Sequence, residues 1–113
     1  MIEVYGIKNC DSVKKALAFF KQHDLAYTLH DFKTDPVSCI EVDRWLQSTD
    51  IKTLFNAKST TYRKLELKNK ELHERDMAEW LCKENLLIKR PVIEYNNTVI
   101  VGFNETNYQG IFL

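Results

Sequence analysis

The amino-acid sequence predicts one domain of the α/β class, with a βαβ unit, a helical insertion over residues 36–85 and a final ββα unit. Three observations lead to this fold class. Within residues 2–32 the apolar period changes from two to helical spacing and back to two. The middle of the chain has apolar stripes at helical spacing. Near the end, two short apolar runs flank an Asn-Asn pair, and a helix-start signal follows them.

The first unit should consist of a strand, a helix and a strand. Apolar side chains alternate along residues 2–5, which predicts a strand that Gly6 ends. From Asp11 to about residue 23 the apolar residues recur at helical spacing, and they are Val13, Ala16, Leu17 and Phe20. The stretch 26–32 alternates again and predicts the second strand. Because a crossover helix connects them, the two strands should be parallel, with a right-handed connection.

The insertion should be helical. Asp35-Pro36 is a helix-start signal, and the apolar stripe that follows it consists of Cys39, Val42, Trp45 and Leu46. A short helix is expected over 51–55, then a loop with a helical turn over 62–67. The next helix should end near 84–85, and its apolar stripe consists of Met77, Trp80 and Leu81.

The β pattern returns after residue 91. Strands are expected over 92–95 and 98–102, and the Asn-Asn pair between them suits a hairpin turn because Asn tolerates positive φ. Asn104 should cap a short closing helix, whose apolar residues are Tyr108, Ile111 and Phe112. Parallel strands first and an antiparallel hairpin last predict a four-stranded mixed sheet with thioredoxin-like connectivity. The inserted helices should pack at one end of this sheet.

Composition limits the classes of function. The chain has 113 residues, with 16 basic and 16 acidic side chains and a formal net charge of zero. This balance favours neither a direct nucleic-acid clamp nor a membrane-surface binder. No apolar run reaches the about 18–20 residues that span a bilayer, and no secretory leader is visible. We therefore expect a cytoplasmic protein.

The three cysteines, Cys10, Cys39 and Cys82, lie far apart in the sequence and form no CxxC pair. This spacing, with three scattered histidines, favours neither a zinc site nor a dithiol redox motif, so we expect no bound metal and no bound cofactor. In a reducing compartment the thiols should stay reduced. Cys39 and Cys82 fall within helical patterns and are interpreted as small core residues.

Cys10 differs from the other two because it lies where the strand pattern changes into the helix pattern. A thiol in the first turn of a helix faces unpaired N–H groups and the positive end of the helix dipole, and both favour the reactive thiolate. Lys8 and Lys14 add positive potential, and Asn9 can orient a substrate oxygen, whereas the charge of Asp11 opposes the effect slightly. The other interpretation is an inert, half-buried cysteine.

Three segments resemble the arsenate reductase-like (ArsC/Spx) family, in particular its small YffB-like branch: YGIKNCDSVKKA, LFNAKSTTYRKL and IKRPVIEYNN. Their order and spacing match over essentially the whole chain. The resemblance implies a single thioredoxin-like domain with a redox-active nucleophile at Cys10. It also implies a cis bond before Pro91, with Arg90 placed opposite the cysteine. The planar fork of Arg90 suits an oxyanion or the carboxylates of glutathione.

The sequence departs from its relatives at two arginines. Arsenate reductases use one in the mid-chain region and one after the last strand, where this chain has Asn56 or Lys58 and then VGFNET. Lys58 can substitute as a point charge, without the bidentate geometry. The stretch NAKSTTYRK is compatible with an anion pocket and equally with a helix cap followed by a solvated basic face. We therefore expect arsenate reduction to be weak at most.

The resemblance implies two alternative functions. In the first, the protein is a thiol oxidoreductase, either a glutathione-dependent thiol reductase or arsenate reductase-like. Cys10 forms a covalent adduct with a small oxyanion or thiol substrate, and glutathione or a glutaredoxin resolves it. In the second, the protein is an Spx-like regulator that binds the C-terminal domain of the RNA polymerase α subunit. Many Spx proteins carry a CxxC switch where this chain has Cys10 and Val13, so we favour the enzyme.

Overall fold

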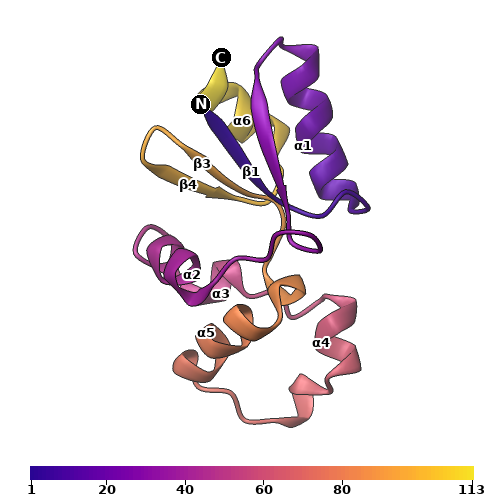
Figure 1. Ribbon diagram of the computed structural model, residues 1–113, viewed down its shortest axis with the longest axis vertical. Coiled ribbons are helices and arrows are strands. Elements are labelled where there is room, and N and C mark those ends of the chain that lie inside the picture. Colours follow the sequence, from indigo (N-terminus) through magenta and orange to yellow (C-terminus); the bar gives the residue numbers. More distant parts are fainter. The chain divides into compact units, whose positions relative to one another are not determined.

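The chain forms two compact units in the computed structural model, which describes all 113 residues. The sheet unit consists of Met1–Lys33 and Arg90–Leu113, and the helical unit consists of Thr34–Lys89. The helical unit is inserted in the chain between the second and third strands (Figure 1).

The sheet unit contains a four-stranded mixed sheet, as the sequence predicts. The strands are β1 (Ile2–Gly6), β2 (Tyr27–Asp31), β3 (Val92–Tyr95) and β4 (Thr98–Val101). Their spatial order is β2-β1-β3-β4. β1 and β2 are parallel, with Val4 opposite Leu29, whereas β3 is antiparallel to both β1 and β4. A parallel βαβ unit followed by an antiparallel hairpin is the thioredoxin-like arrangement, so the predicted fold class is confirmed.

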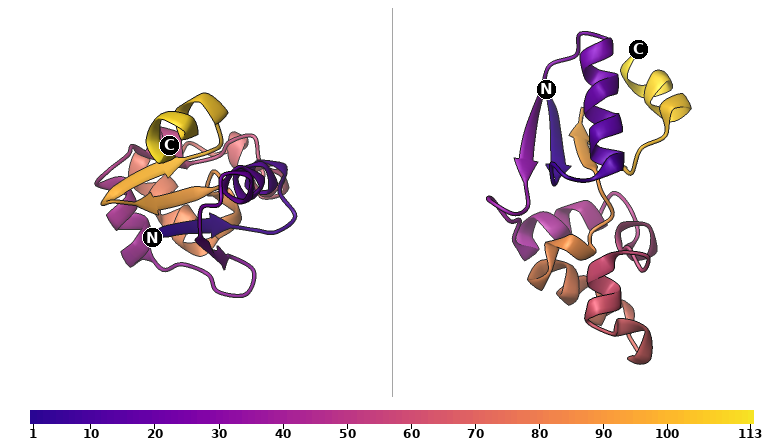
Figure 2. Two further views of the ribbon diagram at one scale, coloured as in Figure 1. Left: turned by 90° about the horizontal axis from the view of Figure 1, so that it is seen from above. Right: turned by 90° about the vertical axis from the view of Figure 1, so that its right-hand side faces the viewer.

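Two helices, α1 (Asp11–Gln22) and α6 (Glu105–Phe112), cover one face of this sheet (Figure 2). Their apolar side chains form an aromatic core in which the rings of Phe20 and Tyr108 stack with centroids 5.8 Å apart. The Tyr108 hydroxyl donates to the Gly102 carbonyl at 2.7 Å. Burial among these rings raises the pKa of Tyr108 above the usual range of a tyrosine.

Asparagines shape the C-terminal part of the sheet unit, as their positions in the sequence predict. Asn96 and Asn97 form the hairpin turn with φ of 49° and 60°. Positive φ at both central residues is the geometry of a type I′ turn, which matches the twist of the flanking strands. The Asn104 side chain accepts from the Asn107 N–H at 2.9 Å and caps α6.

The opposite face of the sheet carries polar side chains. Glu3 and Tyr5 alternate with the buried residues of β1 and therefore point away from α1 and α6. His30 Nε2 lies 2.7 Å from a carboxylate oxygen of Glu3, and the His30 ring stacks on Tyr5 with centroids 4.5 Å apart. The Tyr5 hydroxyl donates to Glu94 at 3.0 Å. A polar, hydrogen-bonded layer thus crosses three strands.

The helical unit contains four α-helices and two 3₁₀ turns. The helices are α2 (Cys39–Leu46), α3 (Ile51–Leu54), α4 (Thr60–Lys64) and α5 (Glu74–Lys83). The 3₁₀ turns are η1 (Leu67–Asn69) and η2 (Asn85–Leu87). The helices bury Val42, Trp45, Ile51, Leu54 and Leu81. The expected helical insertion is therefore present, although two of its helices begin elsewhere than predicted.

Caps explain both differences. Helix α2 begins at Cys39, three residues after Pro36, because Ser38 and Glu41 form a capping box there. The helical turn expected over 62–67 begins at Thr60, because the Ser59 hydroxyl accepts the Tyr62 N–H at 3.0 Å. A side-chain cap therefore fixes each start more strongly than the apolar stripe does.

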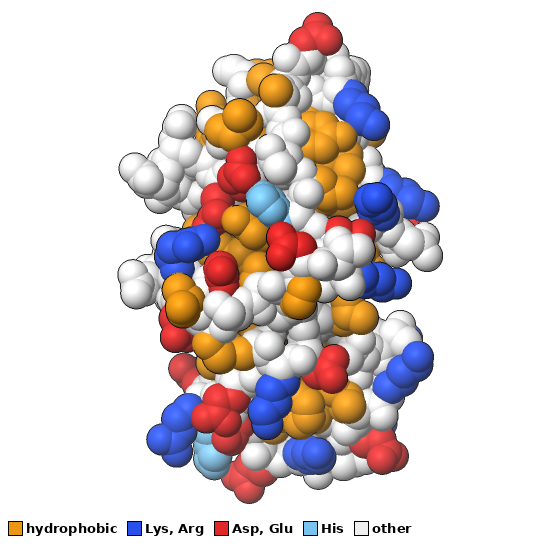
Figure 3. Space-filling view, viewed as in Figure 1, with side chains coloured by type: hydrophobic (Ala, Val, Ile, Leu, Met, Phe, Trp, Pro, Cys, Tyr) orange, Lys and Arg blue, Asp and Glu red, His pale blue; other side chains and the backbone are white.

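The surface mixes charges of both signs. On the face drawn in Figure 3, Lys and Arg side chains are interspersed with Asp, Glu and apolar ones. This distribution agrees with the formal net charge of zero. None of the helices combines the length and the apolar character that a membrane crossing requires.

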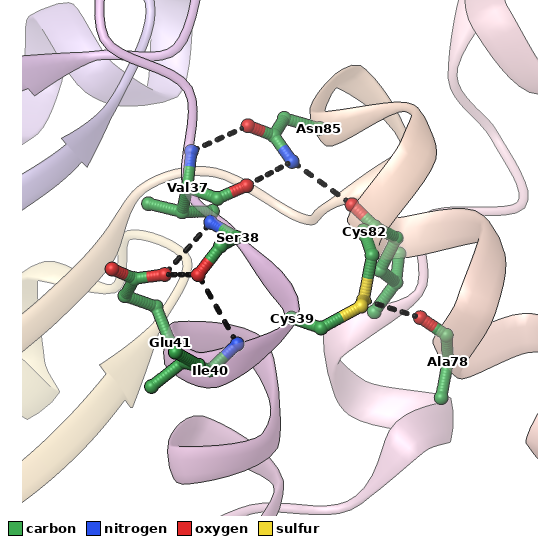
Figure 4. Close-up of a disulfide and its surroundings, with 9 residues drawn as sticks. Val37, Ser38, Cys39, Ile40, Glu41, Ala78, Cys82 and Asn85 are labelled. Carbon is green, nitrogen blue, oxygen red and sulfur yellow. Dashed lines mark hydrogen bonds between the residues drawn. A yellow bond between two sulfur atoms is a disulfide. The ribbon is translucent and has the colours of Figure 1, made fainter.

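The expectation that Cys39 and Cys82 are reduced core residues is wrong. Their sulfurs form a disulfide that joins the first residue of α2 to the last turn of α5 (Figure 4). Cys39 is exposed and Cys82 is half-buried, so neither is a core residue. The spacing of the two cysteines does not predict this disulfide, because 43 positions separate them in the sequence. The packing of α2 on α5 brings their Cα atoms to 5.0 Å.

Candidate functional site

Cys10 is the N-cap residue of α1. Its φ of −142° and ψ of 124° are extended, and its carbonyl accepts the Lys14 N–H at 2.9 Å, the first bond of the helix. Its side chain makes no capping hydrogen bond and is partly exposed. With Cys39 and Cys82 joined, Cys10 is the free cysteine of the chain. A free cysteine thus lies where the first N–H groups of α1 lack helical acceptors.

Gly6 allows the helix to start at this place. The glycine ends β1, and its carbonyl accepts the Phe32 N–H at 2.8 Å. A Cβ at this position would lie 2.7 Å from Cγ2 of Val13, closer than real Cβ contacts come. Because Val13 is fully buried, α1 can approach the end of β1 only when residue 6 has no side chain. The close approach of Gly6 and Val13 thus brings together the strand end before the Cys10 loop and the helix after it.

Arg90 lies on another side of the same glycine. Its Cβ is 3.8 Å from the place that a Cβ on Gly6 would occupy, so the arginine side chain starts beside the end of β1. The side chain is partly exposed, and its Nε atom is buried. The Arg90–Pro91 bond is cis, as predicted. The buried Pro91 carbonyl accepts the Gly102 N–H at 2.8 Å, which joins this bend to the end of β4.

The other predicted residues of the sheet unit surround Cys10 in the chain. Lys8 and Asn9 are exposed in the loop between β1 and α1, and Lys14 is exposed in the first turn of the helix. Asp11, also exposed, is the acidic residue of that turn. The structure therefore places these four residues on the loop and the helix start that flank Cys10 in the chain. No group of metal-ligating side chains forms in the chain.

Lys58 belongs to the helical unit. It is exposed in the segment between α3 and α4, and its backbone N–H donates to the Asn56 side chain at 3.0 Å. The hydroxyl of Ser59, next in the chain, caps α4. Of the two interpretations of the stretch NAKSTTYRK, the one with a helix cap agrees with the Ser59 cap. Arg63 of this stretch is exposed on α4. A role for Lys58 at the Cys10 site stays a prediction.

Comparison with known proteins places the chain in a family. The family model of the ArsC family matches residues 5–111. The chain belongs to the ArsC family. This assignment covers Cys10 and Arg90 together, because both lie within the matched residues.

Three proteins illustrate how this ArsC-family chain relates to others. A Haemophilus influenzae protein is 39% identical over 113 residues, which cover 99% of each chain. The solved structure of the YFFB protein has a TM-score of 0.92 at 33% identity and covers all of both chains. The global transcriptional regulator Spx of Streptococcus mutans is 29% identical over 107 residues, 93% of this chain and 78% of the regulator. The family thus includes relatives with a regulatory name.

For this ArsC-family chain, the predicted cis bond before Pro91 and the predicted position of Cys10 at the strand–helix junction are confirmed, whereas the close contact of Gly6 with α1 was missed. The sequence pattern indicates only that the glycine ends a strand. The signal that could have found its second role is a glycine four residues before a cysteine at a strand–helix junction, where close backbone approach is a common reason for glycine.

Proposed function

We propose that this ArsC-family protein is a thiol oxidoreductase that uses Cys10 as its single nucleophile and glutathione as co-substrate. The observation that carries the proposal is the position of Cys10, a partly exposed free thiol at the N-cap of a 12-residue helix. The unpaired N–H groups and the positive end of the helix dipole stabilise a thiolate at such a position. Lys8 and Lys14 add positive charge nearby in the chain, and Asn9 is available to orient a substrate atom.

The reaction consists of two thiol–disulfide exchanges. The Cys10 thiolate attacks a glutathione mixed disulfide, RS–SG, forms Cys10–SG and releases RS⁻, which takes a proton from water. A glutathione thiolate then attacks the Cys10 adduct, releases GSSG and restores the Cys10 thiolate. The sum is RSSG + GSH → RSH + GSSG. An external thiol, glutathione or a glutaredoxin, must resolve the adduct, because fully buried Val13 stands where a CxxC motif has its second cysteine.

Arg90 supplies the positive group for an anionic substrate in this proposal. A guanidinium binds carboxylates and tetrahedral oxyanions through two parallel N–H bonds, which a lysine cannot reproduce. The support is its place beside Gly6, at the strand end from which the Cys10 loop departs. Pro91 fixes the bend after it through its cis bond.

Removal of the nucleophile tests the reaction. We expect the purified protein to reduce a glutathionylated peptide with glutathione as reductant, and Cys10→Ser to abolish this turnover without unfolding the protein. The matched control is the double variant Cys39→Ser, Cys82→Ser, which removes the other two sulfurs and should retain activity. Turnover that survives in Cys10→Ser would end the proposal.

Substitution of Arg90 tests the anion site. Arg90→Ala should raise the KM for glutathione about tenfold, and Arg90→Lys should restore only part of the affinity, because one ammonium replaces a planar fork. Arg75→Ala, which removes an exposed arginine of α5, serves as the control. An unchanged KM in Arg90→Ala would remove the arginine from the site.

A second candidate is a regulatory protein. The support is the 29% identity to the Streptococcus mutans regulator over 107 residues. In this alternative the protein binds the C-terminal domain of the RNA polymerase α subunit. It would do so without a dithiol switch, because buried Val13 occupies the position of the second cysteine of a CxxC motif. A pull-down with the purified α-subunit domain distinguishes the two: Cys10→Ser should still be captured if the protein is a regulator, and no capture would exclude this function.

A further inference from the structure

The disulfide of the helical unit lies outside the site around Cys10 and has no part in the proposed reaction. It joins Cys39, the first residue of α2, to Cys82, the last but one of α5, and 43 positions of sequence separate them. The two cysteines differ in their exposure to solvent, because Cys39 is exposed and Cys82 is half-buried. A dissolved thiol can therefore reach this bond from the Cys39 side.

A second connection holds the same two segments together without the covalent bond. The buried side chain of Asn85, just after α5, accepts the Val37 N–H at 2.8 Å. It donates to the Val37 carbonyl at 3.3 Å and to the Leu81 carbonyl at 2.9 Å (Figure 4). Buried amide hydrogen bonds of this kind are costly to break. The segment before Cys39 therefore stays attached to the end of α5 when the disulfide opens.

The start of α2 is also fixed locally. The Ser38 hydroxyl accepts the Ile40 N–H at 3.2 Å, and the Glu41 carboxylate accepts the Ser38 N–H at 2.7 Å. This capping box determines where the helix begins, and so where Cys39 lies, by contacts within four residues. Neither the capping box nor the Asn85 connection depends on the oxidation state of the sulfurs.

The structure also contains a partner for the reduced sulfur. Cys82 Sγ lies 3.4 Å from the carbonyl oxygen of Ala78, one turn earlier in α5. A disulfide sulfur carries no hydrogen and cannot donate to this oxygen, whereas a thiol can. After reduction, the half-buried Cys82 thiol thus has an acceptor within reach and needs no change of the helix.

We propose that Cys39 and Cys82 form a second redox site, which cycles between dithiol and disulfide while the helical unit stays folded. In the oxidation, the Cys39 thiolate attacks a low-molecular-weight disulfide, RS–SR, which gives Cys39–SR and releases one RS⁻. The Cys82 thiolate then attacks the Cys39 sulfur and releases the second RS⁻. Each released RS⁻ takes up the proton that a cysteine lost, so RSSR + 2 Cys–SH gives 2 RSH and one disulfide.

The reduction follows the same path in reverse. A dissolved thiolate attacks the sulfur of the exposed residue Cys39 and expels Cys82 as a thiolate, which takes a proton and donates to Ala78. A second thiolate then releases Cys39. The exposed cysteine is therefore the entry point in both directions, and the half-buried cysteine is the one that closes or opens the ring.

Glutathione buffers of graded GSH to GSSG ratio test this site, with the Cys10→Ser protein as background so that two thiols remain. Free thiols are alkylated and the mass of the intact protein is measured. We expect one reversible transition that involves both cysteines, and far-ultraviolet circular dichroism that is the same at both ends. The proposal is overturned if the pair stays reduced in the most oxidising buffer, or if reduction requires denaturant.

Single-cysteine variants in the same background test the order of events. Cys82→Ser retains Cys39 and should accumulate a stable glutathione adduct with GSSG. Cys39→Ser retains Cys82 and should form this adduct at least tenfold more slowly, because its sulfur is half-buried. Equal rates would overturn the assignment of Cys39 as the entry point.

A third variant tests the positioning of the pair. Asn85→Ala removes the noncovalent connection and should favour the dithiol by about five- to tenfold in the glutathione equilibrium, because the two sulfurs meet less often. Asn69→Ala, at an exposed asparagine of the same unit, is the control and should not shift it. If Asn85→Ala is folded and its equilibrium is unchanged, the buried amide does not position the cysteines.

Discussion

Gly6 shows how a single missing side chain positions the candidate nucleophile. The glycine lies between Val13 of α1 and Arg90, and a Cβ there would meet Cγ2 of Val13 at 2.7 Å. The contact links the residue that begins the Cys10 loop, the core face of the helix and the start of the Arg90 side chain. The sequence indicates a glycine at the end of a strand but not what lies against it, because the neighbours come from distant parts of the chain.

Gly6→Ala should therefore destabilise the protein by about 1–3 kcal/mol, the usual cost of forcing extra volume into a packed core. Urea denaturation measures the loss. Gly110→Ala is the matched control, because nothing lies within 4 Å of the added methyl group; there we expect a gain of up to about 1 kcal/mol. Adding Val13→Ala to Gly6→Ala should recover part of the loss, and equal losses with and without it would contradict the contact.

Glu41 makes part of the stability depend on pH. The hydrogen bond from the Ser38 hydroxyl, followed by those from backbone N–H groups, lowers the pKa of the Glu41 carboxyl. With the folded pKa below the unfolded one, the carboxylate contributes stability above the unfolded value of about 4.3, and this stability is lost as the pH falls through the folded value.

Glu41→Gln should consequently flatten the fall in unfolding free energy between about pH 5 and pH 3. Glu79→Gln, at an exposed glutamate of α5, provides the comparison. Denaturant midpoints measured across this range check the expectation. Parallel pH curves for the wild type and Glu41→Gln would show that the ionised form of Glu41 adds no stability to the folded protein.

At the scale of elements, periodicity predicts the strands and the longer helices because burial of one face determines them. It fails where local polar contacts decide. Helix α2 begins at its Ser38 cap, and α4 begins after Ser59 rather than at the first apolar residue. The disulfide could not be predicted either, because the contact of α2 with α5 exists only after both helices have packed.

The N-terminal end of α1 should influence Cys10 through charge. Lys14→Gln removes a cation from the first turn and should slow alkylation of Cys10 by about two- to fivefold at low salt, because the thiolate is the reacting form. Lys21→Gln makes the same change in the last turn and should leave the rate unchanged. The difference should shrink in 1 M salt, where charges are screened within about 3 Å. Equal rates for the two variants at low salt would exclude this influence.

The covalent link between α2 and α5 should add to the stability only while the disulfide is closed, and the noncovalent contacts of the two helices remain in both states. In the chain-entropy model, a cross-link over a loop of this length contributes about 2–4 kcal/mol. Cys39→Ser should lower the unfolding free energy by that amount without reductant and by far less with dithiothreitol. A loss of the same size in both conditions would instead indicate that the serine disturbs the start of α2.

For the whole molecule, the sequence predicts a thioredoxin-like chain with a helical insertion, and the structure has both. The predicted site residues divide between the units: Cys10 and Arg90 belong to the sheet unit and Lys58 to the helical unit. The position of a residue beside a strand, such as Arg90 before β3, can be predicted from the sequence because the pairing of the strands determines it. A residue of an insertion has no such pairing, so its distance from the site does not follow from the pattern.

Arsenate tests the function of the complete protein. We expect weak or undetectable arsenate reduction in a glutaredoxin-coupled assay. Arg90 is the one arginine that we assign to the anion, and the resemblance to arsenate reductases puts asparagine or lysine at the position of a second arginine. Reduction of a glutathionylated peptide by the same preparation is the control for activity. Efficient turnover of arsenate would show that the missing arginines are not needed.

The closed disulfide also changes the topology of the chain, since residues 39–82 become a covalent ring with two linear tails. A protease that nicks this ring, for example after the exposed Lys68 or Lys70, opens the ring but separates nothing, because both fragments remain attached through sulfur. The same nick in the dithiol form leaves two pieces that only noncovalent packing retains. A nick in the helical unit therefore leaves one covalent molecule in the disulfide form and two separate chains, held together only by packing, in the dithiol form.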